Sequence, residues 1–308
     1  MALPLLAAVR CEAGLLPGHP FSNAASGTTS AAFLKLPNGA RYEALGGAAA
    51  AFAPGPEALF WNPAGLVGSG QDLSLSYGAL LESAYEGAAA YRLSPLGPVS
   101  LALGAQYLSQ SALTSFDSVG DPTGSFAPYD LALTAGAGMP LGGLRLGAAA
   151  KLIHSSLADQ SATTAAVDLG LQADHVSDVG DGPLDLGASL SNLGPGLKLG
   201  SVASPLPLTI RGGAAWHASP NFNFLLDLLI PVDQDPYVCI GGEARLPTGA
   251  GDYLLRMGFN QAHAHGIDGL TGLTLGAGFD WPGLRLDYAW VPYGDLGMTH
   301  RVTLAFRL

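Results

Sequence analysis

From about Gln71 to the C-terminus, apolar residues alternate with small or polar residues in one short segment after another. The last segment is a clear example, and its apolar residues are Val302, Leu304, Phe306 and Leu308. Side chains on a β-strand point alternately to its two faces, so each segment has one apolar face and one small or polar face. Gly, Pro, Asn and Asp close the segments, as they do at turns. The pattern predicts strands along most of the chain.

The chain is hydrophobic, yet it contains no run long enough for a membrane helix, which needs about 20 apolar residues. Hydrophobic residues make up 48% of it, charged residues only 12%, and the mean hydropathy is +0.30. A soluble domain carries about 25% charged residues. A soluble β-sandwich or β-solenoid would also alternate, but an outer face of Leu, Phe, Tyr and Trp would aggregate in water. We therefore expect an all-β protein, a transmembrane antiparallel β-barrel of a bacterial outer membrane.

The alternating segments number about fourteen, and an even number brings both ends of the barrel wall to the periplasmic side. The expected segments begin near residues 71, 85, 97, 125, 143, 161, 182, 207, 221, 236, 252, 269, 283 and 300. Tyr and Trp lie near segment ends, at Tyr129, Trp216, Trp281, Trp290 and Tyr293. Aromatic residues in such positions are typical of the girdles at membrane interfaces.

Two sets of short motifs lie outside this general pattern. The first set comprises residues 38–41, 44–48 and 57–66, and the last of these reads Glu-Ala-Leu-Phe-Trp-Asn-Pro-Ala-Gly-Leu. The second set comprises residues 207–211, 269–278, 286–297 and 299–301. Together they resemble outer-membrane proteins of the PorV/PorQ type, which are related to FadL-type channels for hydrophobic compounds. The resemblance covers nearly the whole chain from about residue 35.

The resemblance implies a small helical plug, or hatch, folded inside the barrel. Its expected members are Phe60, Trp61, Asn62, Pro63 and Gly65. The chain then divides into a signal remnant or flexible N-terminal segment (1–34), a plug with the Asn-Pro-Ala element (35–70) and the barrel (71–308). Within 1–34, Leu3–Val9 could be a short hydrophobic signal region, although no Lys or Arg precedes it.

Asn62 and Pro63 form the most specific local signal in the plug. Asn is favoured at a helix N-cap and Pro at the first helical position, so a short helix is expected to begin here. By resemblance, Phe60, Trp61 and Asn62 close the barrel and contact a ligand in the lumen. The alternative, which we favour, is that this helical turn fills the barrel and anchors the first strand.

The loop from Val291 to Thr299 is the second candidate site. Asp295 lies between Gly294 and Gly297, a composition that suits a tight turn. Tyr293 and Asp295 would then form a rim facing a partner protein, or the loop is simply the last hairpin connection. We favour the second interpretation.

Catalytic, metal and cofactor sites have little support. His263 and His265, with Asp268 nearby, form a weak metal motif, since a catalytic zinc site needs three protein ligands, and an exposed loop is the favoured alternative. There is no Gly-x-Ser-x-Gly elbow and no dinucleotide-binding motif, so we expect no enzyme, cofactor or metal. A net charge of −11 disfavours nucleic acid. Cys11 and Cys239 match no metal-binding spacing, and whether they pair stays open.

Two functions follow from the resemblance. The first is docking or shuttling of secreted or surface proteins, as in type IX secretion, or service as an assembly partner. The alternative is a FadL-like channel for uptake of hydrophobic small molecules, which small inward residues would suit: Gly147, Ala149, Gly213 and Gly276. The expected partners are membrane lipid, secreted or other outer-membrane proteins, and hydrophobic small molecules. A third function, an outer-membrane enzyme, has no support in the residues.

Overall fold

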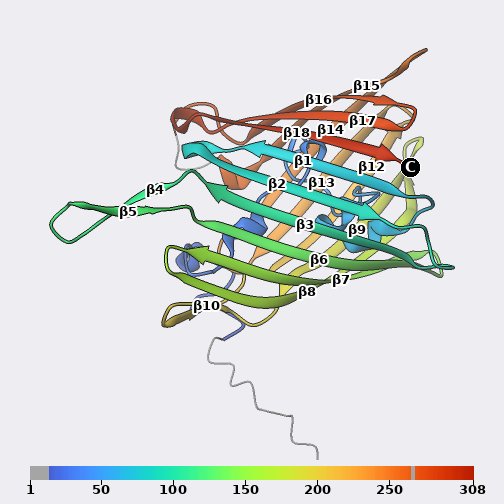
Figure 1. The fold of residues 1–308 in the computed structure, drawn as a ribbon. Coiled ribbons are helices and arrows are strands. Elements are labelled where there is room, and N and C mark those ends of the chain that lie inside the picture. The colour runs from blue at the N-terminus through green and yellow to red at the C-terminus, as the bar shows by residue number, and fades with distance from the viewer. Residues whose placement is uncertain (1–13, 265–267) are drawn as a thin grey trace, which may run out of the picture.

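The strands form one closed antiparallel barrel in the computed structural model, which describes residues 14–264 and 268–308 (Figure 1). Its strands, in chain order, are β1 (Asp72–Ala79), β2 (Ala84–Arg92), β3 (Ser100–Gln110), β6 (Tyr129–Leu141), β7 (Leu144–Leu157), β8 (Gln160–Val179), β9 (Gly182–Leu193), β12 (Thr209–Ser219), β13 (Phe222–Pro231), β14 (Tyr237–Thr248), β15 (Gly251–Asn260), β16 (Leu273–Trp281), β17 (Leu284–Pro292) and β18 (Met298–Arg307). β1 pairs with β18 and closes the barrel. The expected fold class, a barrel of fourteen strands, is confirmed.

The expected segments match the observed strands closely. The largest differences between expected and observed starts, four residues, are at β6 (125 against Tyr129) and β16 (269 against Leu273). Two hairpins outside the barrel were not expected. They are β4 (Leu113–Phe116) with β5 (Pro122–Phe126), and β10 (Leu197–Leu199) with β11 (Val202–Ser204).

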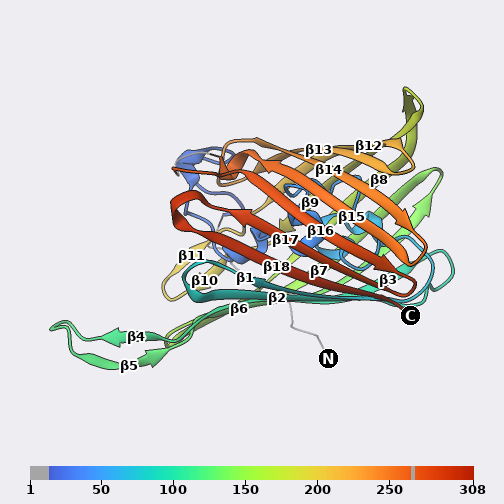
Figure 2. The same ribbon diagram turned by 90° about the horizontal axis from the view of Figure 1, so that it is seen from above.

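The two ends of the barrel differ in the length of their connections. One end has short turns, such as Gly142-Gly143, and here Leu308 N donates to the carbonyl of Gln71 (2.8 Å). The other end carries the β4–β5 hairpin, which projects away from the C-terminus (Figure 2), and the long connections 194–208 and 261–272. Short turns are periplasmic and long loops external in outer-membrane barrels. We therefore name the two ends periplasmic and external.

The outer wall is apolar between two rows of aromatic residues. Near the external end, Tyr85, Tyr107, Tyr129 and His154 lie on four neighbouring strands, with successive ring centroids 6.3, 6.1 and 5.8 Å apart. The corresponding periplasmic row includes Trp216, Phe224, Tyr253, Phe279 and Trp281. Exposed leucines lie between the rows, among them Leu133, Leu152, Leu226 and Leu255. Such a band between aromatic girdles matches the hydrocarbon core of a membrane. The protein is therefore a transmembrane barrel of the outer-membrane type.

Residues 35–70, called the plug below, lie inside the barrel (Figure 1). The helical turns of the chain are η1 (Asn23–Ala25), η2 (Ala32–Lys35), α1 (Ala40–Glu43), α2 (Ala58–Trp61), η3 (Pro63–Leu66), η4 (Leu81–Ser83), η5 (Gln261–His263) and η6 (Gly294–Leu296). In the described ranges, every helix is too short to cross a membrane. The plug is built largely of alanine and glycine, and Ala40, Ala44, Ala48 and Ala49 are completely buried.

Glycines on the inner face of the wall let the plug come close. A Cβ atom at Gly147 would lie 2.1 Å from the carbonyl carbon of Pro63, and one at Gly276 would lie 2.4 Å from Cβ of Ala44. Real Cβ atoms do not approach so closely, so only glycine fits at these positions. Gly147 and Gly276, two of the small residues expected to face inward, therefore do so and pack against the plug.

The segment before the plug lies against the loops of the external end. Phe21 N donates to the carbonyl of Val232 (2.7 Å), and Ser30 N donates to that of Pro205 (2.8 Å). Phe33 is buried in a cluster with Ile153 and Leu206. Residues 21–34 therefore cross the external mouth of the barrel and cover part of it.

Candidate functional site

Asn62 joins the two helical turns at the centre of the plug. It ends α2 and is the N-cap of η3, with Pro63 at the first position, and its Oδ1 accepts a hydrogen bond from Ala64 N (3.1 Å). The expected N-cap is confirmed. A side-chain acceptor is needed here because the first N–H groups of a helix have no partner within the helix.

The same side chain fastens the plug to the wall. Asn62 Nδ2 donates to the carbonyl of Ala50 in the plug (2.7 Å), of Leu171 in β8 (3.1 Å) and of Ala188 in β9 (3.3 Å). A Cβ atom at Gly170 would lie 2.1 Å from Asn62 Oδ1, so glycine is required beside it. Asn62 is completely buried, and its contacts are those of an anchor.

Pro63 and Gly65 also pack against backbone. Pro63 is buried against Gly147 of β7, and a Cβ atom at Gly65 would lie 1.9 Å from the carbonyl oxygen of Ala53. Both residues therefore shape the turn and its contact with the wall.

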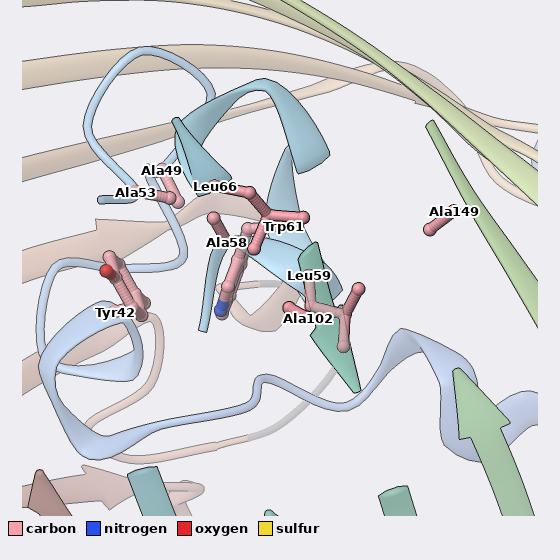
Figure 3. Close-up of a cluster of buried hydrophobic side chains, with 9 residues drawn as sticks. All are labelled: Tyr42, Ala49, Ala53, Ala58, Leu59, Trp61, Leu66, Ala102 and Ala149. Atoms are coloured by element: carbon pink, nitrogen blue, oxygen red, sulfur yellow. The ribbon is translucent and has the colours of Figure 1, made fainter. Parts of the chain in front are cut away.

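Trp61 belongs to a hydrophobic cluster between plug and wall (Figure 3). Its ring lies 5.3 Å from that of Tyr42, and its Nε1 donates to the carbonyl of Asn38 (2.8 Å). In Figure 3, Leu59 lies beside Ala102 of β3. Apolar packing and one satisfied indole N–H hold the Trp61 ring in place.

A cavity of about 280 Å³ lies in the external half of the lumen, directly against the plug. Phe60 and Trp61 line it from the plug, and Tyr237 and Tyr293 line it from the external end. A hollow of about 530 Å³ adjoins it at the external loops and shares Tyr237 and Ala262 with it. About half of the residues that line the cavity against the plug are polar or charged, among them Asn192, Gln234 and Arg211. A concave site that combines aromatic surface with polar groups is typical of small-molecule sites.

The predicted site residues divide between this cavity and its surroundings. Phe60, Trp61 and Tyr293 all line the cavity, although Tyr293 is remote in sequence from the plug. The position of Tyr293 near a strand end predicted that it belongs to the outer aromatic girdle, and this prediction was wrong. Its ring packs against His263, with the ring centroids 5.2 Å apart. Asp295 lies on the exposed surface of η6 and does not line the cavity.

His263 lies in η5, at the external side of the cavity. Burial lowers the pKa of its imidazole, so the ring is neutral at pH 7. Its Nδ1 is buried and has no hydrogen-bond partner among the residues that the structure describes. His265, the other histidine of the weak metal motif, lies outside these residues, and they contain no cluster of three metal-ligating side chains. Cys239 is buried, and Cys11 lies outside the described residues.

Two groups of buried ion pairs tie the plug to the wall, one towards the periplasmic end and one towards the external end. Arg41 donates to Glu243 (3.0 and 2.8 Å), and Glu243 also accepts from Arg256 (2.6 Å). Arg256 and Arg285 both bind Asp287 (2.7 Å each). A second group joins Glu43 of the plug to Arg301 of β18 and Glu86 of β2. Charges buried in this way need complete pairing.

These ion-pair groups were not predicted from the sequence, although a signal for them exists. The inner, non-lipid face of the alternating segments carries charged residues, namely Arg285, Asp287 and Arg301. Charged side chains at such positions need either a water-filled lumen or charged partners in the plug. Their partners in the plug are far away in sequence: Glu57 pairs with Arg285 (3.4 Å), and Glu43 pairs with Arg301. Only the closed barrel brings these residues together.

Comparisons with known proteins agree with this architecture. No family model and no curated protein sequence matches the chain. Among solved structures, the Ralstonia pickettii toluene transporter TbuX superposes with a TM-score of 0.61 at 16% identity, over 88% of this chain and 98% of that chain. The Pseudomonas putida toluene transporter TodX gives 0.58 at 13% identity, over 87% and 96%. A Pseudomonas aeruginosa FadL homologue gives 0.53 at 9% identity, over 88% and 99%. The chain therefore has a FadL-like barrel fold, and a relation to PorV/PorQ proteins stays a prediction.

Proposed function

We propose that the protein is an outer-membrane channel for the uptake of small hydrophobic molecules. The observation that carries the proposal is the cavity against the plug, with Phe60 and Trp61 as its floor. It adjoins the external hollow, so a molecule from outside would reach the plug there. The FadL-like fold supports this function over the docking of secreted proteins.

The plug separates this cavity from the periplasmic end. A third hollow, of about 330 Å³, lies on its other side and is lined by Arg41, Phe52 and Glu243. Between the two hollows lie buried residues such as Leu45, Ala48 and Cys239. Passage through the lumen therefore requires the plug to shift, and the ion pairs of Arg41 and Glu43 keep it closed at rest.

Uptake of radiolabelled toluene by cells that produce the barrel tests the proposal. We expect faster uptake than in cells without it. Ala262→Trp, which places a large side chain where the cavity meets the external hollow, should slow uptake to the background rate. Leu228→Trp, on the lipid-facing wall, is the matched control and should transport normally. Equal uptake with and without the barrel would contradict the proposal.

A second candidate function, docking of a secreted or surface protein, is favoured by the β4–β5 hairpin. It projects beyond the external end (Figure 2), and its Phe116 and Val119 are 62% and 85% exposed. Exposed apolar residues at such a site suit a protein contact. Mass spectrometry of material co-purified from native membranes, with and without residues 113–126, tests this function. A stoichiometric protein lost with the hairpin supports docking, and bound small molecules alone refute it.

A further inference from the structure

The charged residues that line the cavity are all cations. Lys35, Lys151 and Arg211 line it, together with the neutral His263, and no described Asp or Glu does. The whole chain has 24 acidic residues and only 13 Lys and Arg. A cavity lined without regard to charge would contain more acids than cations. The cavity therefore presents positive groups, although the chain as a whole is acidic.

Each cation is paired with a carboxylate that does not line the cavity. Lys35 Nζ lies 2.7 Å from Asp233, Lys151 Nζ lies 2.7 Å from Asp168, and Arg211 Nη1 lies 2.9 Å from Asp227. Each of these acids is 1% exposed. Three ion pairs thus have their positive members at the cavity and their negative members buried away from it. The dipoles of these pairs favour an anion in the cavity.

Arg211 is positioned for such an anion. Its Nη1 donates to the carbonyl of Gly47 (2.5 Å) and to Asp227, and its guanidinium lies over the Trp61 ring (5.2 Å). Within the described part of the chain, its Nε and Nη2 donate no hydrogen bond. A guanidinium held in this way presents donors in a fixed geometry that matches a carboxylate.

Lys151 reaches the same region of the wall. Its Nζ donates to Asn192 Oδ1 (2.7 Å). The neighbouring Ser191 pairs with Thr209, which is two residues from Arg211 along β12. Two residues of a strand span about 7 Å. Both cations therefore line the same cavity, Lys151 from the side of β8 and β9 and Arg211 from the side of β13.

The apolar part of a ligand has its own contacts in the cavity. Phe60 and Trp61 offer aromatic surface, and Leu36 and Leu229 offer aliphatic surface. The volume of about 280 Å³ is at the lower end for ligand sites, so it suits a small molecule and not a long chain.

We propose that the cavity binds small amphipathic carboxylates, with the carboxylate at Arg211 and the apolar body on Phe60 and Trp61. This inference rests on the proposed channel function and names the ligand class of the same site. The cations would add recognition of an anionic group to the aromatic surface that a neutral hydrocarbon would also contact.

Calorimetric titration of the purified barrel with phenylacetate and with phenylacetamide tests the inference. The two molecules have nearly the same shape, both dissolve in water, and only the first is an anion. We expect at least tenfold tighter binding of phenylacetate, because hydrogen bonds to ionised groups are roughly twice as strong as neutral ones. Equal affinities would overturn the inference.

Two double variants locate the effect. Arg211→Met with Asp227→Asn removes the cavity pair without leaving a buried charge, and it should abolish the preference for phenylacetate. Arg145→Met with Asp174→Asn makes the same two substitutions at a partly exposed ion pair near the periplasmic end and should leave the preference intact. Altered migration of the unheated barrel in gels reports folding for each variant. A preference that survives the cavity substitution would also overturn the inference.

The outcomes separate the inference from the function on which it rests. Toluene uptake that needs the barrel, with no preference for phenylacetate, would refute the ligand class and leave the channel in place. An Arg211-dependent preference in a barrel that takes up neither labelled toluene nor labelled phenylacetate would support the binding site and refute the channel.

Discussion

Replacing Asn62 by alanine should release the plug. The substitution removes the N-cap of η3 and the donors to Ala50, Leu171 and Ala188. Loss of a cap costs about 1 kcal/mol. The amide carries two N–H groups, and each buried hydrogen bond contributes about 1 kcal/mol. The docked plug should therefore lose about 3 kcal/mol, which is roughly a hundredfold shift towards the displaced state.

Single-channel recording in planar bilayers measures this shift as the fraction of time that the barrel conducts. We expect a large rise for Asn62→Ala. Asn62→Asp keeps the acceptor that caps η3, but its carboxylate has no N–H group to donate to the carbonyl oxygens around it. This variant should therefore open the barrel as well. Asn221→Ala, in the β12–β13 turn, should behave like the unaltered protein. An Asn62→Ala barrel that stays closed would refute the reasoning that this side chain anchors the plug.

Two further perturbations test the plug contact and the external hairpin. Gly147→Ala forces a Cβ atom to 2.1 Å from the Pro63 carbonyl carbon and should lower the free energy of unfolding by about 1–3 kcal/mol. The control Gly212→Ala, whose Cβ atom meets open space, should not lower it. Thermal unfolding in detergent measures both variants, and equal stabilities would contradict the close contact. Hydrogen bonds from the backbone N–H groups of Asp121 and Val119 lower the pKa of Asp117, so its contribution to hairpin stability is complete above the ordinary value of 3.8 and is lost as the pH falls through the lowered pKa. The protection factor of the Val119 amide, which corrects the exchange rate for its intrinsic pH dependence, should therefore fall only below about pH 3.8, and Asp117→Asn should remove this change. A fall in the protection factor between pH 7 and 5 would show that another group controls the turn.

The strands of the wall could be predicted because their signal is local. Alternation follows from the geometry of one strand, as at Leu284, Leu286, Tyr288 and Trp290, and it does not depend on which strand lies next to it. The turns are marked by residues such as Gly142 and Gly283, which have positive φ angles. The shift of β16 to Leu273 arises because residues 269–272 pair with loops instead of continuing the strand.

The interior of the barrel could not be predicted in the same way. The partners Arg41 and Glu243 are 202 residues apart, and nothing near either residue indicates the other. The small polar residues before Leu34 resemble a linker, yet contacts with Pro205 and Val232 give them a place at the external mouth. Tyr293 lies near a strand end like the girdle residues, and only the path of its loop directs it into the cavity. Of the candidate site, Asn62 as a helix cap was predictable, while the cations of the cavity were not.

A disulfide that locks the plug provides the most direct test of a channel in which the plug must shift. A Cβ atom at Gly47 of the plug would lie 3.8 Å from Sγ of Cys239 in β14, so Gly47→Cys in a Cys11→Ser background places two thiols within bonding reach. Toluene uptake should stop when this variant is oxidised and return when it is reduced. Uptake that continues unchanged in the oxidised barrel, with the disulfide verified by mass spectrometry, would contradict a pathway that the plug closes.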